Sequence, residues 1–149
     1  MHEVHLRPAV REDAAGLAAL TAVMGYEVST ASAADRLHSL PADHAVFVAH
    51  DVDDVVGFVH VYVDHTLLLE RRAQLGGLAV LDGWHGRGVA AALLRRAEGW
   101  AAEAGCSTLF VRSGEAREQA HRFYVRAGYR PHKRQQVFVK DVGAARPTS

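Results

Sequence analysis

The sequence predicts a single-domain α/β (α+β) protein. Two runs with strand period are joined by the acidic turn at 51–54, which indicates a hairpin. Helical periodicity recurs in about four separate segments, with strand patterns between them. At 149 residues, the chain can bury about 70% of its unfolded surface in one core. We therefore expect one domain over residues 1–142 and a flexible tail over 143–149.

The first 65 residues predict one strand, two helices and the hairpin. Glu12 and Asp13 favour a helix start, because acids near a helix N-terminus interact well with its dipole. Pro41 ends the second helix, since proline cannot continue it. In the hairpin, alternation turns His60 and Tyr62 to one face of the sheet. The expected elements are strand 4–10, helix 11–24, helix 32–40 and strands 45–50 and 55–65.

The rest of the chain predicts further strands around a long helix. Gly105 and Gly128 each follow a helical pattern, as expected of glycine after a helix C-terminus. We expect the long helix to bury Val89, Leu93, Ala97 and Trp100, and the only cysteine, Cys106, to lie in the core. The expected elements are strand 74–80, the long helix up to 104, strand 107–112, helix 115–127 and at least one strand in 135–142.

The composition narrows the possible partners. Basic and acidic residues number 17 each, so no overall field favours nucleic acid or an anionic membrane. A single cysteine excludes an intrachain disulfide and a cysteine zinc cluster. The 10 histidines are scattered without metal-ligand spacing, so we expect no metal. The N-terminus lacks a signal-peptide pattern and no apolar stretch is long enough for a membrane helix, which predicts a soluble, cytoplasmic protein.

A glycine-punctuated turn joins the fourth expected strand to the long helix. The strand ends with Leu78, Ala79 and Val80, and the turn residues are His85, Gly86, Arg87, Gly88, Val89 and Ala90. Glycines let backbone N–H groups approach a ligand, and the helix adds a positive N-terminal end. Pyrophosphate is the expected ligand. A Walker A site is excluded because the lysine is missing, and the Rossmann pattern fails because Ala91 stands where its third glycine is required.

The same turn resembles motif A of the GNAT superfamily of N-acetyltransferases, whose pattern Q/R-x-x-G-x-G/A binds the pyrophosphate of acetyl-CoA. Gly88 and Ala90 match this pattern, whereas His85 replaces the usual glutamine or arginine. A second segment resembles motif B of the superfamily. It matches at Ala120, Phe123, Tyr124, Gly128 and Tyr129.

The resemblance implies a GNAT fold, as in small bacterial members. That fold is a mixed, mostly antiparallel sheet of about six to seven strands flanked by about four helices. It also implies an acetyl-CoA-dependent N-acetyltransferase that works by direct attack in a ternary complex. Tyr124 then takes the position of the general acid that faces the CoA sulfur. Arg117 replaces the usual asparagine, and Ser113 or Arg117 can supply the missing contact, with His121 nearby.

The resemblance also implies how acetyl-CoA is held beside the fourth strand. Gly76 and Gly77 predict a bulge where this strand splays from the fifth. The backbone of Leu78 and Val80 is then expected to pair with pantetheine, and an N–H near Val80 to polarise the acetyl carbonyl. The full set of expected cofactor-binding residues is Leu78, Ala79, Val80, His85, Gly86, Arg87, Gly88, Val89, Ala90, Ser113, Arg117 and His121.

The general base has no clear sequence signal. A primary amine with a pKa near 10.4 costs about 4.6 kcal/mol to deprotonate at pH 7. Family members often carry a glutamate in the fourth strand, where this chain has Gln74, Gly76 and Gly77. The candidates that remain are His60, His65 or Glu70 through water, and His121 as a residue that orients water. The expected substrate-binding residues are Tyr26, Glu27, His60, Tyr62 and Asp64.

Two other functions remain open. The missing glutamate and the change at Arg117 are also compatible with a catalytically silent acyl-CoA-binding regulatory domain. A nucleotide-binding module could use the same glycine turn. The acceptor amine is not indicated by the sequence, and a homodimer through the terminal strands or a helical face is a hypothesis.

Overall fold

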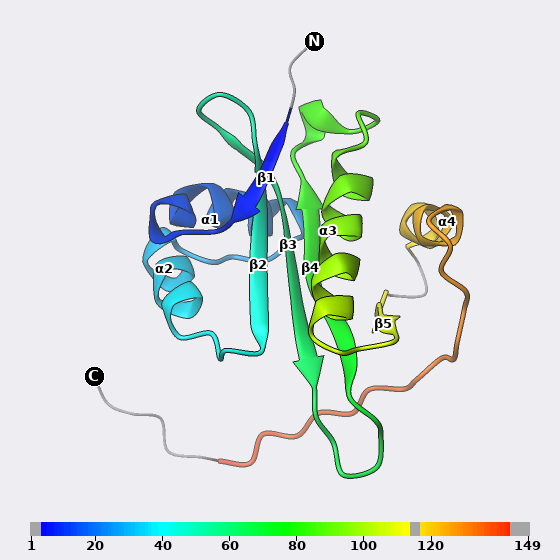
Figure 1. Ribbon diagram of the computed structural model, residues 1–149. Helices are drawn as coiled ribbons and strands as arrows, with labels where there is room; N and C mark the ends of the chain where they lie inside the picture. Colours follow the sequence, from blue (N-terminus) through cyan, green and yellow to red (C-terminus); the bar gives the residue numbers. More distant parts are fainter. Residues whose placement is uncertain (1–3, 114–116, 144–149) are drawn as a thin grey trace. The chain divides into compact units, whose positions relative to one another are not determined.

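A computed structural model describes residues 4–113 and 117–143 (Figure 1). The chain divides into two units, Met1–Arg112 and Ser113–Ser149, and each is described by itself. The first unit combines a mostly antiparallel sheet with helices, so the predicted fold class is confirmed. In the described residues, no helix is long and apolar enough to cross a membrane.

The first unit contains a five-stranded sheet in the order β1-β2-β3-β4-β5. Neighbouring strands are antiparallel except for β4 and β5, which are parallel. The strands are β1 (His5–Pro8), β2 (His44–His50), β3 (Val55–Asp64), β4 (Arg72–Val80) and β5 (Leu109–Phe110). The helices are η1 (Arg11–Asp13), α1 (Ala14–Val23), α2 (Thr30–His38), η2 (Asp82–Trp84) and α3 (Val89–Glu103). These bounds confirm the expected order, although β5 is shorter than expected.

The β2–β3 hairpin follows the predicted alternation. Asp51 donates its N–H to the Asp54 carbonyl at 3.0 Å, which closes the acidic turn. Phe47 pairs with Val59, and both are buried on one face. Because successive strand residues alternate, His60 and Tyr62 lie on the opposite face, as predicted.

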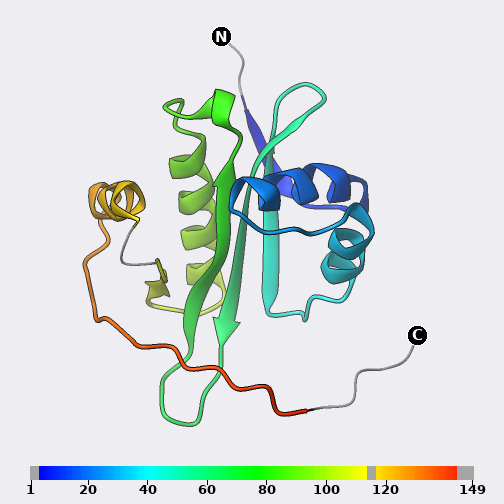
Figure 2. The same ribbon diagram turned by 180° about the vertical axis from the view of Figure 1, so that it is seen from behind.

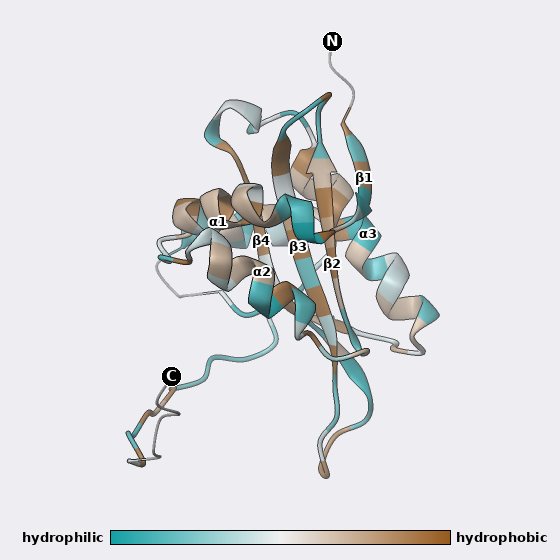
Figure 3. Ribbon diagram, turned by 90° about the vertical axis from the view of Figure 1, so that its left-hand side faces the viewer, coloured by the Kyte–Doolittle hydropathy of each residue, from teal (hydrophilic) through white to brown (hydrophobic). Residues whose placement is uncertain are grey.

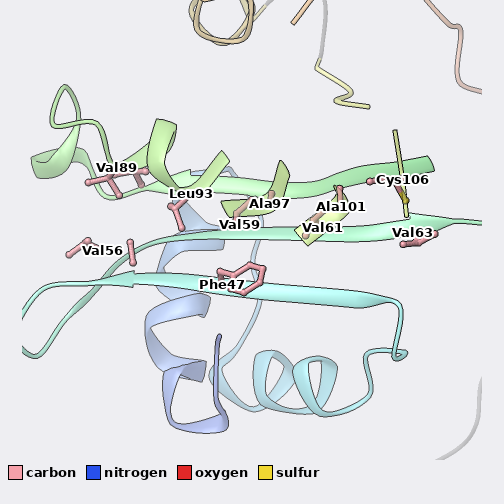
Figure 4. Packing of buried hydrophobic residues seen from close by; sticks show 13 residues of the cluster. Phe47, Val56, Val59, Val61, Val63, Val89, Leu93, Ala97, Ala101 and Cys106 are labelled. Atoms are coloured by element: carbon pink, nitrogen blue, oxygen red, sulfur yellow. The ribbon is translucent and has the colours of Figure 1, made fainter. Parts of the chain in front are cut away.

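Helix α3 covers one face of the sheet, and α1 covers part of the other (Figures 2 and 3). Figure 4 shows Leu93 and Ala97 of α3 beside Val59 and Val61 of β3. Leu93 is fully buried there. The predicted apolar stripe is confirmed except at Trp100, which is only partly buried and packs at the margin of the cluster.

The start of α1 is tied to β1 by a two-pronged ion pair. The two terminal nitrogens of Arg7 donate to Asp13 Oδ2 at 2.7 Å and Oδ1 at 2.9 Å, and the Val10 N–H donates to Oδ2 at 2.8 Å. These bonds satisfy a carboxylate that is only 5% exposed. The Arg7 hydrogen bond, assisted by the Val10 N–H, lowers the pKa of Asp13 although burial opposes this shift.

We expect Asp13→Asn to destabilise the protein by about 2 kcal/mol at pH 7, because a buried charge-assisted hydrogen-bond pair is lost. The folded-state pKa of Asp13 lies below its unfolded value, so this stabilisation is full above about pH 4 and is lost as the pH falls further. Urea unfolding at several pH values measures the difference. A gap between wild type and variant that stayed constant down to pH 2 would contradict this account.

The second unit contains α4 (Glu118–Arg126). Gly128, with φ +97°, follows the helix end as predicted. The expected start of this helix at 115 and the apolar position Ala116 lie outside the described residues.

The strand expected over 135–142 is wrong. None of these residues belongs to a strand of the described structure, and the side chains of Val137, Phe138 and Val139 are 80%, 87% and 91% exposed. An apolar run indicates a tendency to extend, but a strand also needs a partner for its backbone groups. The described sheet therefore has five strands instead of the expected six to seven.

Candidate functional site

The turn between β4 and α3 is shaped by two glycines in the left-handed region. Gly86 has φ +77° and Gly88 has φ +78°, a conformation that costs a residue with a side chain about 1–2 kcal/mol. A Cβ atom built at either position meets no atom within 4 Å. Both glycines are therefore required by backbone geometry and leave open space above the turn.

Helix α3 begins at this turn with an uncapped N-terminus. Gly88 is the N-cap residue and has no side chain to accept from the first backbone N–H groups, and the first turn contains no acid. The N–H groups of Val89 and Ala90 lack intrahelical acceptors by helix geometry. In the same turn, the Arg87 guanidinium lies 4.7 Å from the Trp84 ring centroid. This arrangement can bind an anion such as pyrophosphate.

Strand β4 is paired with β5 along only a short part of its length. Ala73 pairs with Leu109 and Gln74 with Phe110, and the pairing stops there. The register on the other side of β4 shifts at the next residues, because His60 pairs with Gly77 while Val61 pairs with Leu75. Gly76 is therefore the extra residue of a bulge. The predicted bulge is confirmed, and it begins where the β4–β5 pairing ends.

Past the bulge, the backbone of Val80 points away from β3. The next residue, Leu81, donates its N–H to Val56 of β3 at 2.9 Å. Because strand groups alternate in direction, the N–H and carbonyl of Val80 face the opposite edge, and so do those of Leu78. His85 Nε2 lies 3.1 Å from the Val80 carbonyl oxygen on that edge. The Ala79 side chain is instead buried against α1.

Two histidines and a tyrosine form a cluster on the face of the sheet opposite α3. His44 Nδ1 and His60 Nε2 lie 2.9 Å apart and share one hydrogen. The Tyr62 ring stacks on His44 with centroids 4.8 Å apart and 10° between their planes. A Cβ atom built on Gly76 would lie only 2.9 Å from His60 Nδ1. The imidazole therefore lies directly over the bulge, at a position that only glycine leaves open.

The surroundings of His60 lower the pKa of its imidazole. Burial lowers its pKa to about 4, with a further contribution from the nearby His44. His60 is therefore a neutral imidazole at pH 7, with one ring nitrogen available as a proton acceptor.

The other expected substrate and base residues are more dispersed. Gln74 is 2% exposed and donates to Asp64 Oδ2 at 3.2 Å, so the position that often holds a glutamate is a buried amide. His65 lies 3.4 Å from Asp43. The remaining predicted residues are exposed and lie outside this cluster. Tyr26 and Glu27 lie between α1 and α2, and Glu70 lies between β3 and β4.

In the second unit, Tyr124 is part of an aromatic cluster. Its ring contacts Phe123 and Tyr129 edge to face, with centroids 5.2 Å and 5.7 Å away. Burial raises the pKa of the Tyr124 hydroxyl, and the opposing effect of Arg117 is smaller. Tyr124 is consequently a protonated hydrogen-bond donor at pH 7.

The remaining expected cofactor residues also belong to the second unit. Arg117 is exposed at the N-terminus of α4, and His121 is half-buried one turn later. The Ser113 hydroxyl is enclosed and has no hydrogen-bond partner among the described residues.

His44 was missed by the sequence reasoning. It belongs to no motif and stands at the start of a strand. The signal that could have found it is the hairpin register, which pairs His44 with Tyr62 and places it diagonally from His60.

A sequence model described as the acetyltransferase (GNAT) family matches residues 14–129, which is more than half of the chain. No match was found among curated proteins.

Solved structures with similar folds cover nearly the whole chain. The aminoglycoside N-acetyltransferase AAC(6')-Iy in complex with CoA has a TM-score of 0.84 at 16% identity, over 94% of this chain and 96% of that one. A putative acetyltransferase from Agrobacterium tumefaciens has a TM-score of 0.81 at 22% identity, over 91% and 99%. The aminoglycoside 6'-N-acetyltransferase AAC(6')-Ih from Acinetobacter baumannii has a TM-score of 0.80 at 16% identity, over 95% and 100%. At these identities the likeness shows the fold.

Proposed function

The chain belongs to the acetyltransferase (GNAT) family and is an acyltransferase, and we propose that it moves the acetyl group of acetyl-CoA to a primary amine by direct attack in a ternary complex. The observation that supports this most strongly is the continuity of the anion-binding turn with the unpaired edge of β4. The turn at Gly86 and Gly88 suits a pyrophosphate, and the backbone of Val80 and Leu78 continues from it along the strand.

In this proposal the pantetheine arm forms hydrogen bonds with the free edge of β4, in the way that a neighbouring strand does. The N–H groups of Leu78 and Val80 donate to acceptors on pantetheine or on the acetyl carbonyl. An N–H aimed at that carbonyl stabilises the negative charge that develops on its oxygen during attack. Ala79 only links these two residues, because its side chain is buried and its backbone groups face β3.

His85 adds a polar contact at the same edge. Its Nε2 donates to the Val80 carbonyl at 3.1 Å, and in this proposal the N–H of pantetheine replaces that bond. Arg87, Val89 and Ala90 complete the proposed pyrophosphate site. Ser113, Arg117 and His121 are proposed as further cofactor contacts from the second unit.

Cleavage of the thioester leaves a thiolate that must gain a proton. We assign this role to Tyr124, whose protonated hydroxyl donates a hydrogen bond to the sulfur and completes the proton transfer in a site that excludes water. We expect Tyr124→Phe to lower kcat about 100-fold and to leave acetyl-CoA affinity within about twofold, because only the proton donor is removed. Steady-state kinetics together with calorimetric titration of acetyl-CoA separates the two effects.

The control for this prediction is Tyr129→Phe, which removes a hydroxyl from the same aromatic cluster. That variant is expected to retain most of the activity. An unchanged kcat in Tyr124→Phe would remove Tyr124 from the mechanism. A low kcat in both variants would indicate that the cluster acts by packing alone.

The acceptor is proposed to be a primary amine on a small molecule or a protein. Similar solved structures include aminoglycoside N-acetyltransferases, one of them bound to a bisubstrate analogue that contains acetylneamine, so neamine is the first amine to test. Spermidine and a peptide with a free N-terminus extend the screen to other amine classes. The balance of 17 basic and 17 acidic residues gives no reason to propose a nucleic acid or membrane partner. Dependence on acetyl-CoA favours a cytoplasmic location.

Thermal unfolding with acetyl-CoA, CoA and ATP tests the ligand directly. A ligand at about 100 times its dissociation constant adds about 2.7 kcal/mol to the free energy of unfolding. We expect the CoA compounds to raise the melting temperature and ATP to have no effect. Absence of a rise with saturating acetyl-CoA would exclude the acetyltransferase function. Binding without turnover of any amine would favour the silent acyl-CoA-binding domain.

A further inference from the structure

A histidine side chain bonds to the edge of β4 that the proposed function assigns to pantetheine. The Nε2 atom of His85 lies 3.1 Å from the carbonyl oxygen of Val80. A carbonyl oxygen can only accept, so Nε2 carries the hydrogen and donates it. The backbone groups of Val80 face away from β3, because the next residue, Leu81, makes the bond to that strand. His85 therefore bonds to a carbonyl on the free edge of β4.

This bond takes the place that a neighbouring strand would use. A backbone N–H that pairs with a carbonyl brings its nitrogen to about 3 Å from the oxygen. His85 Nε2 already lies at that distance from the Val80 oxygen. A pantetheine amide that pairs with Val80 approaches the same oxygen from the same open edge. The imidazole and the amide therefore compete for one acceptor.

The His85 side chain can leave the carbonyl without moving the turn. Its side chain is 64% exposed, and the carboxylate of Asp82, 3.8 Å from the same Nε2, offers the displaced N–H a second acceptor. The turn is closed by its own backbone, because Trp84 donates its N–H to Leu81 at 2.9 Å and His85 donates its N–H to Asp82 at 3.3 Å. His85 itself has an ordinary extended backbone, with φ −66° and ψ 146°.

We propose that His85 is a displaceable cap on the Val80 carbonyl, which competes with pantetheine and lowers the affinity of the protein for CoA and acetyl-CoA. This inference rests on the proposed function. The cap satisfies an acceptor on an open strand edge, and such edges otherwise invite pairing with other chains. The imidazole returns to the carbonyl as CoA leaves, so the same competition favours release of the product.

Competition predicts that removal of the imidazole affects only ligands that carry pantetheine. CoA must displace His85, whereas 3'-phosphoadenosine 5'-diphosphate, the nucleotide half of CoA, leaves the bond in place. We expect His85→Leu to lower the Kd of CoA about fivefold and to leave the Kd of the nucleotide within about twofold, because one hydrogen bond no longer has to be displaced. Calorimetric titration of the full chain with each ligand measures both values.

Two further variants serve as controls. Glutamine keeps an N–H donor on its side chain, so His85→Gln should bind CoA within about twofold of wild type. His38 is exposed in the last turn of α2, outside the proposed cofactor site, and His38→Leu should match wild type with both ligands. Thermal unfolding of each variant verifies that it is folded.

Unchanged or weaker CoA binding in His85→Leu would overturn the proposal, because His85 would then not compete with the cofactor. Equal tightening of both ligands would also overturn it, since the effect would then lie at the anion-binding turn. So would equal tightening in His85→Leu and His85→Gln, because loss of the donor would not be the cause. Failure of the proposed function has a different signature, in which wild-type protein binds no CoA and the cap has no competitor.

Discussion

Replacing Gly88 with alanine is expected to weaken acetyl-CoA binding about 100-fold. Gly88 has φ +78°, so an alanine must either accept strain or move the turn out of the left-handed region. Either response displaces the first N–H groups of α3 from the diphosphate. Loss of about two charge-assisted hydrogen bonds costs about 3 kcal/mol, which corresponds to about two orders of magnitude in the dissociation constant. Calorimetric titration with acetyl-CoA measures this change.

Gly25→Ala is the matched control for Gly88→Ala. Gly25 has a similar φ of +88°, has equally open space around a built Cβ atom, and follows α1 instead of preceding α3. Both variants should lose about 1–2 kcal/mol of folding stability, but only Gly88→Ala should lose affinity. Wild-type affinity in Gly88→Ala would show that the turn does not bind the cofactor through its backbone.

Replacing Leu93 with alanine is expected to destabilise the protein by about 3 kcal/mol. Leu93 is 0% exposed and packs from α3 onto the sheet among buried valines. Truncation removes buried methyl groups and leaves a cavity that a sheet and a helix cannot fully close. Urea unfolding should show the loss as a lower midpoint with an unchanged slope. The melting temperature should fall by about 10 °C.

Leu68→Ala is the control for this change, because Leu68 is 89% exposed in the β3–β4 connection. Its effect should stay within about 0.5 kcal/mol. Comparable losses at both positions would contradict the assignment of Leu93 to the core. Leu93→Ala also tests the site indirectly, since α3 presents the proposed pyrophosphate site at its N-terminus. If it remains folded, that variant should bind acetyl-CoA with little change.

The turn and the bulge could be predicted because their signals are local. Positive φ angles at Gly86 and Gly88 follow from glycine itself at a strand-to-helix junction, and paired glycines at Gly76 and Gly77 indicate an interrupted strand. Both features depend on a few adjacent residues.

The histidine pair could not be predicted as a unit. His44 and His60 are 16 residues apart in sequence, and their hydrogen bond depends on the hairpin register and the bulge together. The same dependence explains the wrong strand over 135–142. Strand propensity depends on the residues of the segment itself, whereas a strand also needs a neighbouring strand to pair with its backbone groups.

By itself, the sequence determined the order of the elements up to α4, most of the buried stripe of α3 and the glycine turn before that helix, because helix and strand periods and glycine conformations are local properties. The tertiary structure alone decided that Asp64 binds a buried Gln74, and that His60 lies over Gly76 as a neutral imidazole. These features arise from contacts between strands, and their energies depend on register and burial, which no single segment encodes.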